Sequence, residues 1–188
     1  MKYFLDCGAN IGQTFEDHLI PTGKYSDHHI ICFEPTPRHF AELLERVSKF
    51  AHLFQSITVC PFALGKTYGF AKMFHKTDAR ADSMFEEFWL NEPMEYQVLT
   101  ATVPLSEFIR RVIRRGEDEM EIKIDIEGGE YLVLLEFLHF YGQSEITWPK
   151  INKIWVEWHK LTDQSQKIQD TIMLRATELG LDLTWWPH

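Results

Sequence analysis

Short, almost continuous apolar runs alternate along this chain with longer segments of helical periodicity. This alternation predicts buried strands, expected at residues 2–6, 29–35, 56–64, 98–105, 120–127, 151–159 and 181–186. Helices are expected between them, at residues 11–19, 37–51, 106–115, 129–140 and 163–179. Strands that are apolar along their whole length indicate a parallel sheet covered on both faces. We therefore predict an α/β fold: a doubly wound, mostly parallel sheet with helices on both faces, which binds ligands beyond the carboxyl ends of its strands.

The middle of the chain is less regular. Residues 70–75 are expected to form a short strand and residues 78–96 a loop. Within that loop, residues 84–96 carry enough aromatic side chains to form either a lid over a substrate or a part of the core. Ser106 is expected to be the N-cap of the helix that follows.

Size and charge bound the class of protein. A chain of 188 residues is expected to form a single domain over residues 1–188. Its 19 Lys and Arg against 28 Asp and Glu give a formal net charge of −9, so we expect no nucleic acid as partner. No apolar stretch has the length of a membrane span and no secretory signal is present, so no membrane association is expected. Cys7, Cys32 and Cys60 lie in apolar runs, which favours buried reduced thiols and a cytoplasmic location.

Two strand ends point to a ligand. Asp6 closes the first strand, and Gly8 and Gly12 let the following backbone turn tightly and approach a ligand at the start of a helix. The dinucleotide fingerprint G-x-G-x-x-G is absent from this loop, which disfavours a nicotinamide-dependent oxidoreductase. Glu34 ends the second strand, about where an acidic residue reaches a ribose hydroxyl pair in such folds. An acidic strand end also suits an ammonium group, so both features fit a nucleoside that carries an amino acid, such as S-adenosylmethionine.

Four segments carry a family resemblance. D-x-G-A-N-x-G at residues 6–12, F-E-P at 33–35, K-I-D-I-E-G-x-E at 123–130 and E-x-H at 157–159 occur in this order, each at a predicted strand end. In this combination the chain resembles the FkbM family of S-adenosylmethionine-dependent methyltransferases. The resemblance implies the seven-stranded, Rossmann-like methyltransferase fold and O-methylation of a sugar or polyketide hydroxyl.

The resemblance also implies a donor site at the ends of the first three strands, made of Asp6, Gly8, Ala9, Asn10, Gly12, Glu34, Phe62 and Ala63. The first five would hold the methionine moiety. Glu34 would accept hydrogen bonds from both ribose hydroxyls, and the last two residues would flank the adenine.

Polar residues of two further strands are expected at the acceptor side. Asp125 and Glu127 close the fourth core strand and Glu157 and His159 the fifth, and the spacing of two puts each pair on one face of its strand. The resemblance implies that Ser83 lies nearby. An alcohol is a poor nucleophile while protonated, so a base within hydrogen-bond reach promotes methyl transfer. Asp125 and His159 are the candidate bases, and Glu157 could orient the imidazole.

Two other interpretations of this group stay open. Asp125, Glu157 and His159 could hold a Mg or Mn ion that acidifies the hydroxyl, although the metal-free arrangement is preferred. In the second, Lys123 neutralises Glu157 or Glu127 and the cluster is a structural ion-pair network. The other histidines show no metal-ligand spacing and are expected at the surface: His18, His28, His29, His39, His52, His75, His139 and His188.

The leading hypothesis is an S-adenosylmethionine-dependent O-methyltransferase acting on a small-molecule or glycan acceptor, most simply a sugar. The alternatives are methylation of a non-sugar small molecule and a non-catalytic module that binds S-adenosylmethionine. The chain begins within the first strand and ends after what reads as the sixth strand of the methyltransferase sheet, with no antiparallel seventh strand evident. We therefore expect a fold trimmed at both ends, acting as a homo-oligomer or within a larger enzyme.

Overall fold

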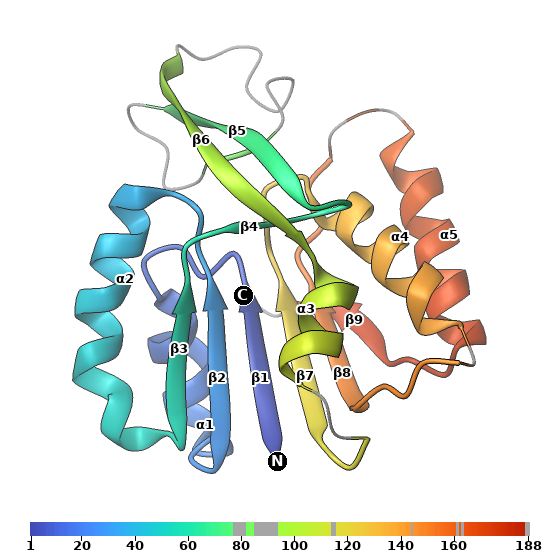
Figure 1. Cartoon of the computed structure of the whole chain (residues 1–188), viewed down its shortest axis with the longest axis horizontal. Helices are drawn as coiled ribbons and strands as arrows, with labels where there is room; N and C mark the ends of the chain where they lie inside the picture. Colours follow the sequence, from blue (N-terminus) through green and yellow to red (C-terminus); the bar gives the residue numbers. More distant parts are fainter. Residues whose placement is uncertain are drawn as a thin grey trace.

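The computed structural model describes residues 1–76, 82–84, 94–113, 116–143, 145–160, 162 and 164–186. Its main sheet has six parallel strands in the spatial order β3-β2-β1-β7-β8-β9 (Figure 1). The strands are β1 (Lys2–Cys7), β2 (His28–Phe33), β3 (Ser56–Cys60), β7 (Glu119–Ile124), β8 (Lys150–Val156) and β9 (Leu183–Trp185). The predicted doubly wound α/β fold is confirmed. Because the strand order reverses between β1 and β7, a ligand crevice is expected at the carboxyl ends of these two strands.

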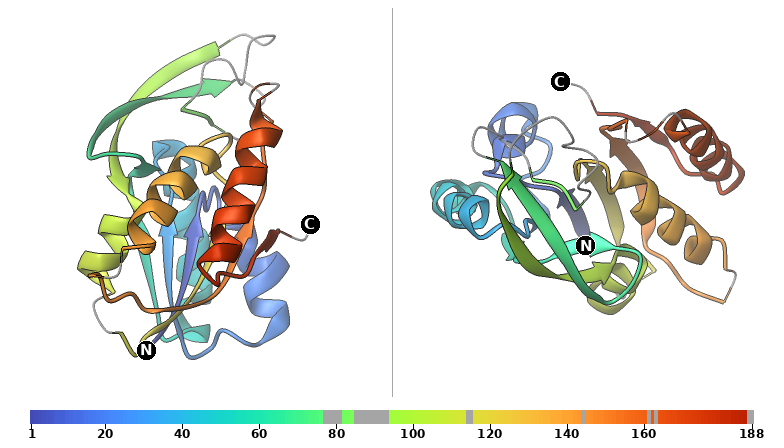
Figure 2. Two further views of the ribbon diagram at one scale, coloured as in Figure 1. Left: turned by 90° about the vertical axis from the view of Figure 1, so that its right-hand side faces the viewer. Right: turned by 90° about the horizontal axis from the view of Figure 1, so that it is seen from above.

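Helices cover both faces of the sheet (Figure 2). One face carries η1 (Phe15–Leu19), α1 (Ile20–Thr22) and α2 (Pro37–Phe50, continued by η2, Ala51–Leu53), and the other carries α3 (Leu105–Val112), α4 (Glu130–Tyr141) and α5 (Ser165–Glu178). Successive strand side chains point to opposite faces, so neighbours on β1 enter different cores. Phe4 lies in the cluster with Leu43 of α2, and Leu5 lies in the cluster with Ile109 of α3 and Val133 of α4.

A second sheet lies beyond the carboxyl ends of the parallel strands (Figure 1). It consists of β4 (Ala63–Gly65), β6 (Met94–Pro104) and β5 (Gly69–Lys76) in that spatial order, and β5 and β6 are antiparallel. The single strand expected at 56–64 is therefore wrong, because β3 ends at Cys60 and residues 63–65 pair with β6 instead. Pro61 has no N–H to give to a ladder, so the first strand stops where the chain turns into the second sheet.

The start of α3 also differs from the expectation. The helix begins at Leu105 after Pro104, and Ser106 is not its N-cap. The Ser106 hydroxyl instead donates a hydrogen bond to the buried carboxylate of Glu136 on α4. This contact joins α3 to α4 on the face that they share.

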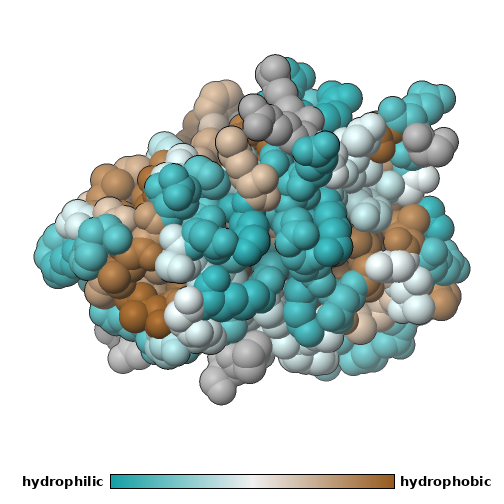
Figure 3. All heavy atoms as spheres, turned by 90° about the horizontal axis from the view of Figure 1, so that it is seen from below, coloured by the Kyte–Doolittle hydropathy of each residue, from teal (hydrophilic) through white to brown (hydrophobic). Residues whose placement is uncertain are grey.

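The amino ends of the strands are polar. The Met1 amino group lies 2.6 Å from a carboxylate oxygen of Asp118, and Lys2 Nζ lies 2.8 Å from Asp27 Oδ2. Figure 3 views the molecule from this end and shows hydrophilic side chains gathered at its centre, with hydrophobic patches to either side. The ligand crevice is at the opposite end.

Two expectations drawn from the sequence concern the cysteine thiols and membrane-spanning segments. Cys7, Cys32 and Cys60 are free thiols and all three are buried, as expected. Among the helices that the structure describes, none has the length and apolar character needed to cross a bilayer.

Candidate active site

The loop after β1 is held between the two neighbouring strands. The backbone N–H groups of Gly8 and Ala9 both donate to the carbonyl oxygen of Phe33 at the end of β2, at 3.1 and 2.9 Å. On the other side, a Cβ on Gly8 would lie 1.7 Å from the carbonyl oxygen of Asp125, and the φ of Gly8 is +86°. Only glycine fits such a position. The loop backbone therefore lies directly at the crevice between β1 and β7.

Glu34 follows β2 and is fixed by loop backbone. One carboxylate oxygen accepts the N–H of Asn10 at 2.9 Å and the other accepts the N–H of Thr36 at 2.8 Å. The residue is 5% exposed, and burial raises the pKa of its carboxyl to about 7, although both hydrogen bonds oppose the rise. The carboxylate is thus rigidly positioned to accept further hydrogen bonds from a ligand.

Asp6, which is expected to hold the methionine moiety, is not among the residues that line the cavity described below. It is fully buried, and its Oδ1 lies 3.2 Å from Nζ of Lys123, its register partner on β7. The same Nζ lies 3.1 Å from Asp125 Oδ2, so Lys123 neutralises these two residues and not Glu127 or Glu157. Burial alone would lower the pKa of Lys123, but the charges of Asp6 and Asp125 raise it, and the side chain stays protonated.

Gly12 and Ser83 make contacts within the protein. Gly12 has a φ of +92°, and a Cβ there would lie 2.9 Å from Leu43 Cδ1, so its role is to let the loop pack on α2. Ser83 is buried, and its hydroxyl donates to the carbonyl oxygen of Glu127 at 2.6 Å. Ser83 therefore ties residues 82–84 to the acceptor-side loop.

A cavity of about 960 Å³ opens at the carboxyl ends of the strands, within the usual range for small-molecule sites. Among the expected donor residues it is lined by Gly8, Ala9, Asn10, Glu34, Phe62 and Ala63. It is also lined by Asp125, Glu127 and Glu157 from the expected acceptor side. One continuous space therefore joins both groups.

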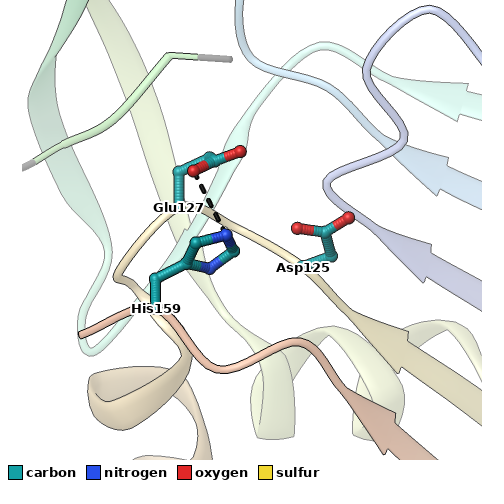
Figure 4. A group of neighbouring side chains, drawn as sticks. All are labelled: Asp125, Glu127 and His159. Atoms are coloured by element: carbon teal, nitrogen blue, oxygen red, sulfur yellow. Dashed lines mark ion pairs between the residues drawn. The ribbon is translucent and has the colours of Figure 1, made fainter. Parts of the chain in front are cut away.

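The acceptor-side residues lie in two loops (Figure 4). β7 ends one residue before Asp125 and β8 one residue before Glu157, so the expected placement of each pair on one strand face is wrong. The groups nevertheless meet: His159 Nε2 lies 3.3 Å from Glu127 Oε2 and 3.7 Å from Glu157 Oε1. In Figure 4 the Asp125 carboxylate lies beside the Glu127 and His159 side chains.

Glu130, which the sequence analysis did not select, orients the imidazole. It is fully buried at the start of α4, and its carboxylate accepts the N–H groups of Ile126 and Gly128 at 2.9 and 3.0 Å. Its Oε1 also lies 3.0 Å from His159 Nδ1. Glu130 thus contacts the Nδ1 side of the imidazole, whereas Glu157, which is expected to orient the ring, lies on the Nε2 side. The signal in the sequence was a glutamate in the first turn of a helix, where a carboxylate can satisfy free N–H groups.

The charges of this cluster decide which group can take a proton. Burial alone would lower the pKa of His159, but its hydrogen bond to Glu130 and the charges of Glu130 and Glu127 raise it to about 9. Burial raises the pKa of Glu127 to about 7, and His159 opposes the rise while Asp125 adds to it. At neutral pH the imidazole already holds a proton, so this geometry favours Glu127 over His159 as the base.

Several histidines expected at the surface lie inside. His28, His39 and His75 are buried, and the Nδ1 atoms of His75 and His39 lie 2.6 Å and 3.7 Å from the carboxylate of Asp82. His39 and Asp82 line the cavity. The helical periodicity could have predicted the burial of His39, because it precedes the buried Leu43 by one helical turn.

Trp186 and His18 are also cavity residues that the sequence analysis missed. Their rings lie 4.8 Å apart, and Lys123 Nζ lies 5.5 Å from the Trp186 ring. Trp186 directly follows β9, so the strand-end rule could have found it. Of the segment considered as a lid, residues 85–93 lie outside the described residues, as does His188.

Comparison with protein families matches the methyltransferase FkbM domain over residues 6–180. No curated protein sequence matches the chain. Among solved structures, the methyltransferase FkbM from Methylobacillus flagellatus KT aligns with a TM-score of 0.49 and 18% identity, over 97% of this chain and 38% of that chain. This chain thus spans well under half the length of that protein. The family match covers most of the sequence and confirms the resemblance: the chain belongs to the FkbM methyltransferase family.

Proposed function

We propose that this protein is a methyltransferase that transfers the methyl group of S-adenosylmethionine to a hydroxyl group of a sugar or glycan. The observation that carries the proposal is the cavity that joins the fixed carboxylate of Glu34 to the loops of Asp125, Glu127 and His159. Membership of the FkbM family supports the donor, because S-adenosylmethionine is the general methyl donor of that family.

The residues at the donor end fit S-adenosylmethionine. Glu34 would accept hydrogen bonds from the ribose hydroxyls. Backbone N–H groups already donate to both of its oxygens, which holds the carboxylate in place and favours its ionised form. The backbone at Gly8 can approach the ligand closely because no Cβ intervenes. Phe62 and Ala63 supply an apolar wall where an adenine ring would lie. When bound, the donor supplies a methyl group on a positively charged sulfur, which an oxygen nucleophile can take as the sulfur becomes a neutral thioether.

The residues at the acceptor end would bind and deprotonate the hydroxyl. Glu127 has a pKa of about 7 and lines the cavity, so its carboxylate can accept the hydroxyl proton near neutral pH. Glu130 and His159 would act as positioning residues, because they hold Glu127 from the protein side. Asp125 and Glu157 offer further acceptors for neighbouring hydroxyls, which suits a sugar.

Charge and thiol chemistry support the remaining parts of the proposal. A net charge of −9 disfavours a nucleic acid as acceptor. Three buried free thiols suit a reducing compartment such as the cytoplasm.

The test is transfer of a radiolabelled methyl group from S-adenosylmethionine to panels of glycosides, non-sugar alcohols and RNA. We expect label in a glycoside, and loss of most of the turnover in Glu127→Gln with little change in the exposed control Glu42→Gln. Labelling of a non-sugar alcohol or an RNA ahead of every glycoside would contradict the glycan acceptor. Full turnover in Glu127→Gln would contradict the assignment of the base.

A further inference from the structure

We propose that Asp125, Glu127 and His159 form a binding site for a divalent metal ion at the acceptor end of the cavity (Figure 4). Only its role in activating a hydroxyl rests on the proposed function. Metal binding itself does not depend on the donor or on the acceptor.

The distances suit such an ion. One ligand atom from each of the three side chains lies within 4.8 Å of the other two. In octahedral coordination at about 2.1 Å, adjacent ligand atoms lie about 3 Å apart and opposite ones about 4.2 Å apart. Small movements of the side chains would therefore complete the site. Asp125 and Glu127 line the cavity, so an ion can enter from solvent.

The imidazole is held from behind, as in metal sites. A histidine that binds a metal through one ring nitrogen almost always donates its other N–H to a carboxylate or carbonyl. Glu130 accepts from Nδ1 of His159, which leaves Nε2 facing Glu127. Glu130 is no member of the ligand set, because it is fully buried and bound to the backbone of Ile126 and Gly128. Its contact therefore points to Nε2 as a ligand independently of the acidic side chains.

The charge around the site also favours a cation. In the part of the chain that the structure describes, the ion pairs here set two cationic side chains, Lys123 and His159, against four carboxylates: Asp6, Asp125, Glu127 and Glu130. Carboxylates in such excess at a partly buried site destabilise one another unless a cation compensates them. A metal ion would replace the proton on Nε2 and add one further positive charge.

The ligand types narrow the choice of ion. Two carboxylates beside one imidazole suit Mn²⁺, since Mg²⁺ prefers oxygen ligands and binds more weakly to nitrogen. Three protein ligands leave further coordination positions, and the cavity is where they would open. A hydroxyl group bound to the ion would be a stronger acid and would lose its proton more easily, which methyl transfer to an alcohol requires.

The test is titration of Mn²⁺ into the chain without donor or acceptor, followed by the loss of the free-ion signal in electron paramagnetic resonance. We expect saturable binding of one ion per chain. Glu127→Gln and His159→Gln should each weaken it tenfold or more. The matched control is Asp170→Asn on the exposed face of α5, which should bind like the wild type.

The proposal would be overturned if the wild type left the free-ion signal unchanged up to about 1 mM Mn²⁺. That concentration corresponds to the weakest affinities of protein sites for such ions. Unchanged affinity in both variants would overturn it as well. Circular dichroism identifies a variant that fails to fold, and Asp125→Asn then provides another ligand position. Calorimetry with S-adenosylhomocysteine on the same samples separates the two proposals: donor binding without Mn²⁺ binding removes only the metal site, and the reverse removes only the donor site.

Discussion

The buried ion pair that joins β1 to β7 predicts a large and specific loss of stability in Lys123→Met. Lys123 is 4% exposed and lies 3.2 Å from Asp6, which is fully buried. Methionine fills a similar volume but leaves the Asp6 carboxylate without its cation, and breaking a buried pair in this way costs about 3–5 kcal/mol. In the double variant Asp6→Asn with Lys123→Met only the partly exposed Asp125 loses its cation and no fully buried charge is left unpaired, so we expect it to be about 2 kcal/mol more stable than the single variant.

Urea unfolding followed by tryptophan fluorescence measures these free energies, because Trp155 and Trp158 are both buried near the sheet. The matched control is Lys153→Met on β8, where the pair with Asp182 is partly exposed and a loss of about 1 kcal/mol or less is expected. A Lys123→Met loss no larger than the control, or a double variant no more stable than Lys123→Met, would show that the Asp6 charge does not need Lys123.

Further predictions concern the loops and the donor site. Gly8→Ala should abolish binding of S-adenosylhomocysteine in calorimetry, because its Cβ would collide with the Asp125 carbonyl. The control is Gly23→Ala, where φ is +62° and the space around the Cβ is open. It should lose only about 1 kcal/mol of stability and bind S-adenosylhomocysteine normally. Donor affinity should fall as the pH drops through about 7, because the raised pKa of Glu34 means that its carboxylate then takes up a proton and loses an acceptor. Glu34→Gln should flatten that dependence, and a slope that persists would assign it to the neighbouring His39 instead. In Glu130→Gln the NMR titration midpoint of His159 should fall from about 9 by a unit or more, since the main opposing charge is gone, and an unchanged midpoint would contradict the role of Glu130.

The parallel sheet could be predicted from the sequence because its signal is local. Core strands such as β1 and β2 carry short apolar runs, Tyr-Phe-Leu and Ile-Ile-Cys-Phe, and a buried strand leaves that pattern whatever its neighbours are. The place of Glu34 at the cavity could be predicted in the same way, because the sequence marks the end of a strand.

Pairings between distant residues could not be predicted. Asp6 looks like a ligand-binding carboxylate until the register of β1 and β7 sets Lys123 beside it, and that register depends on residues more than a hundred positions apart. The same is true of Ser83, whose partner is a carbonyl of the loop after β7. The second sheet was missed because Pro61 ends β3 within one apolar run, and hydrophobicity alone does not show such a break.

The proposed methyl-donor site depends most directly on Glu34. The measurement is calorimetric titration of S-adenosylhomocysteine into wild type, Glu34→Ala and the exposed control Glu42→Ala on the neighbouring helix. We expect binding to wild type and control, and a loss of at least tenfold in Glu34→Ala, since two hydrogen bonds to a charged acceptor are worth well over 1.4 kcal/mol. Absence of binding to wild type, or equal binding by Glu34→Ala, would contradict the proposal that this cavity holds the methyl donor.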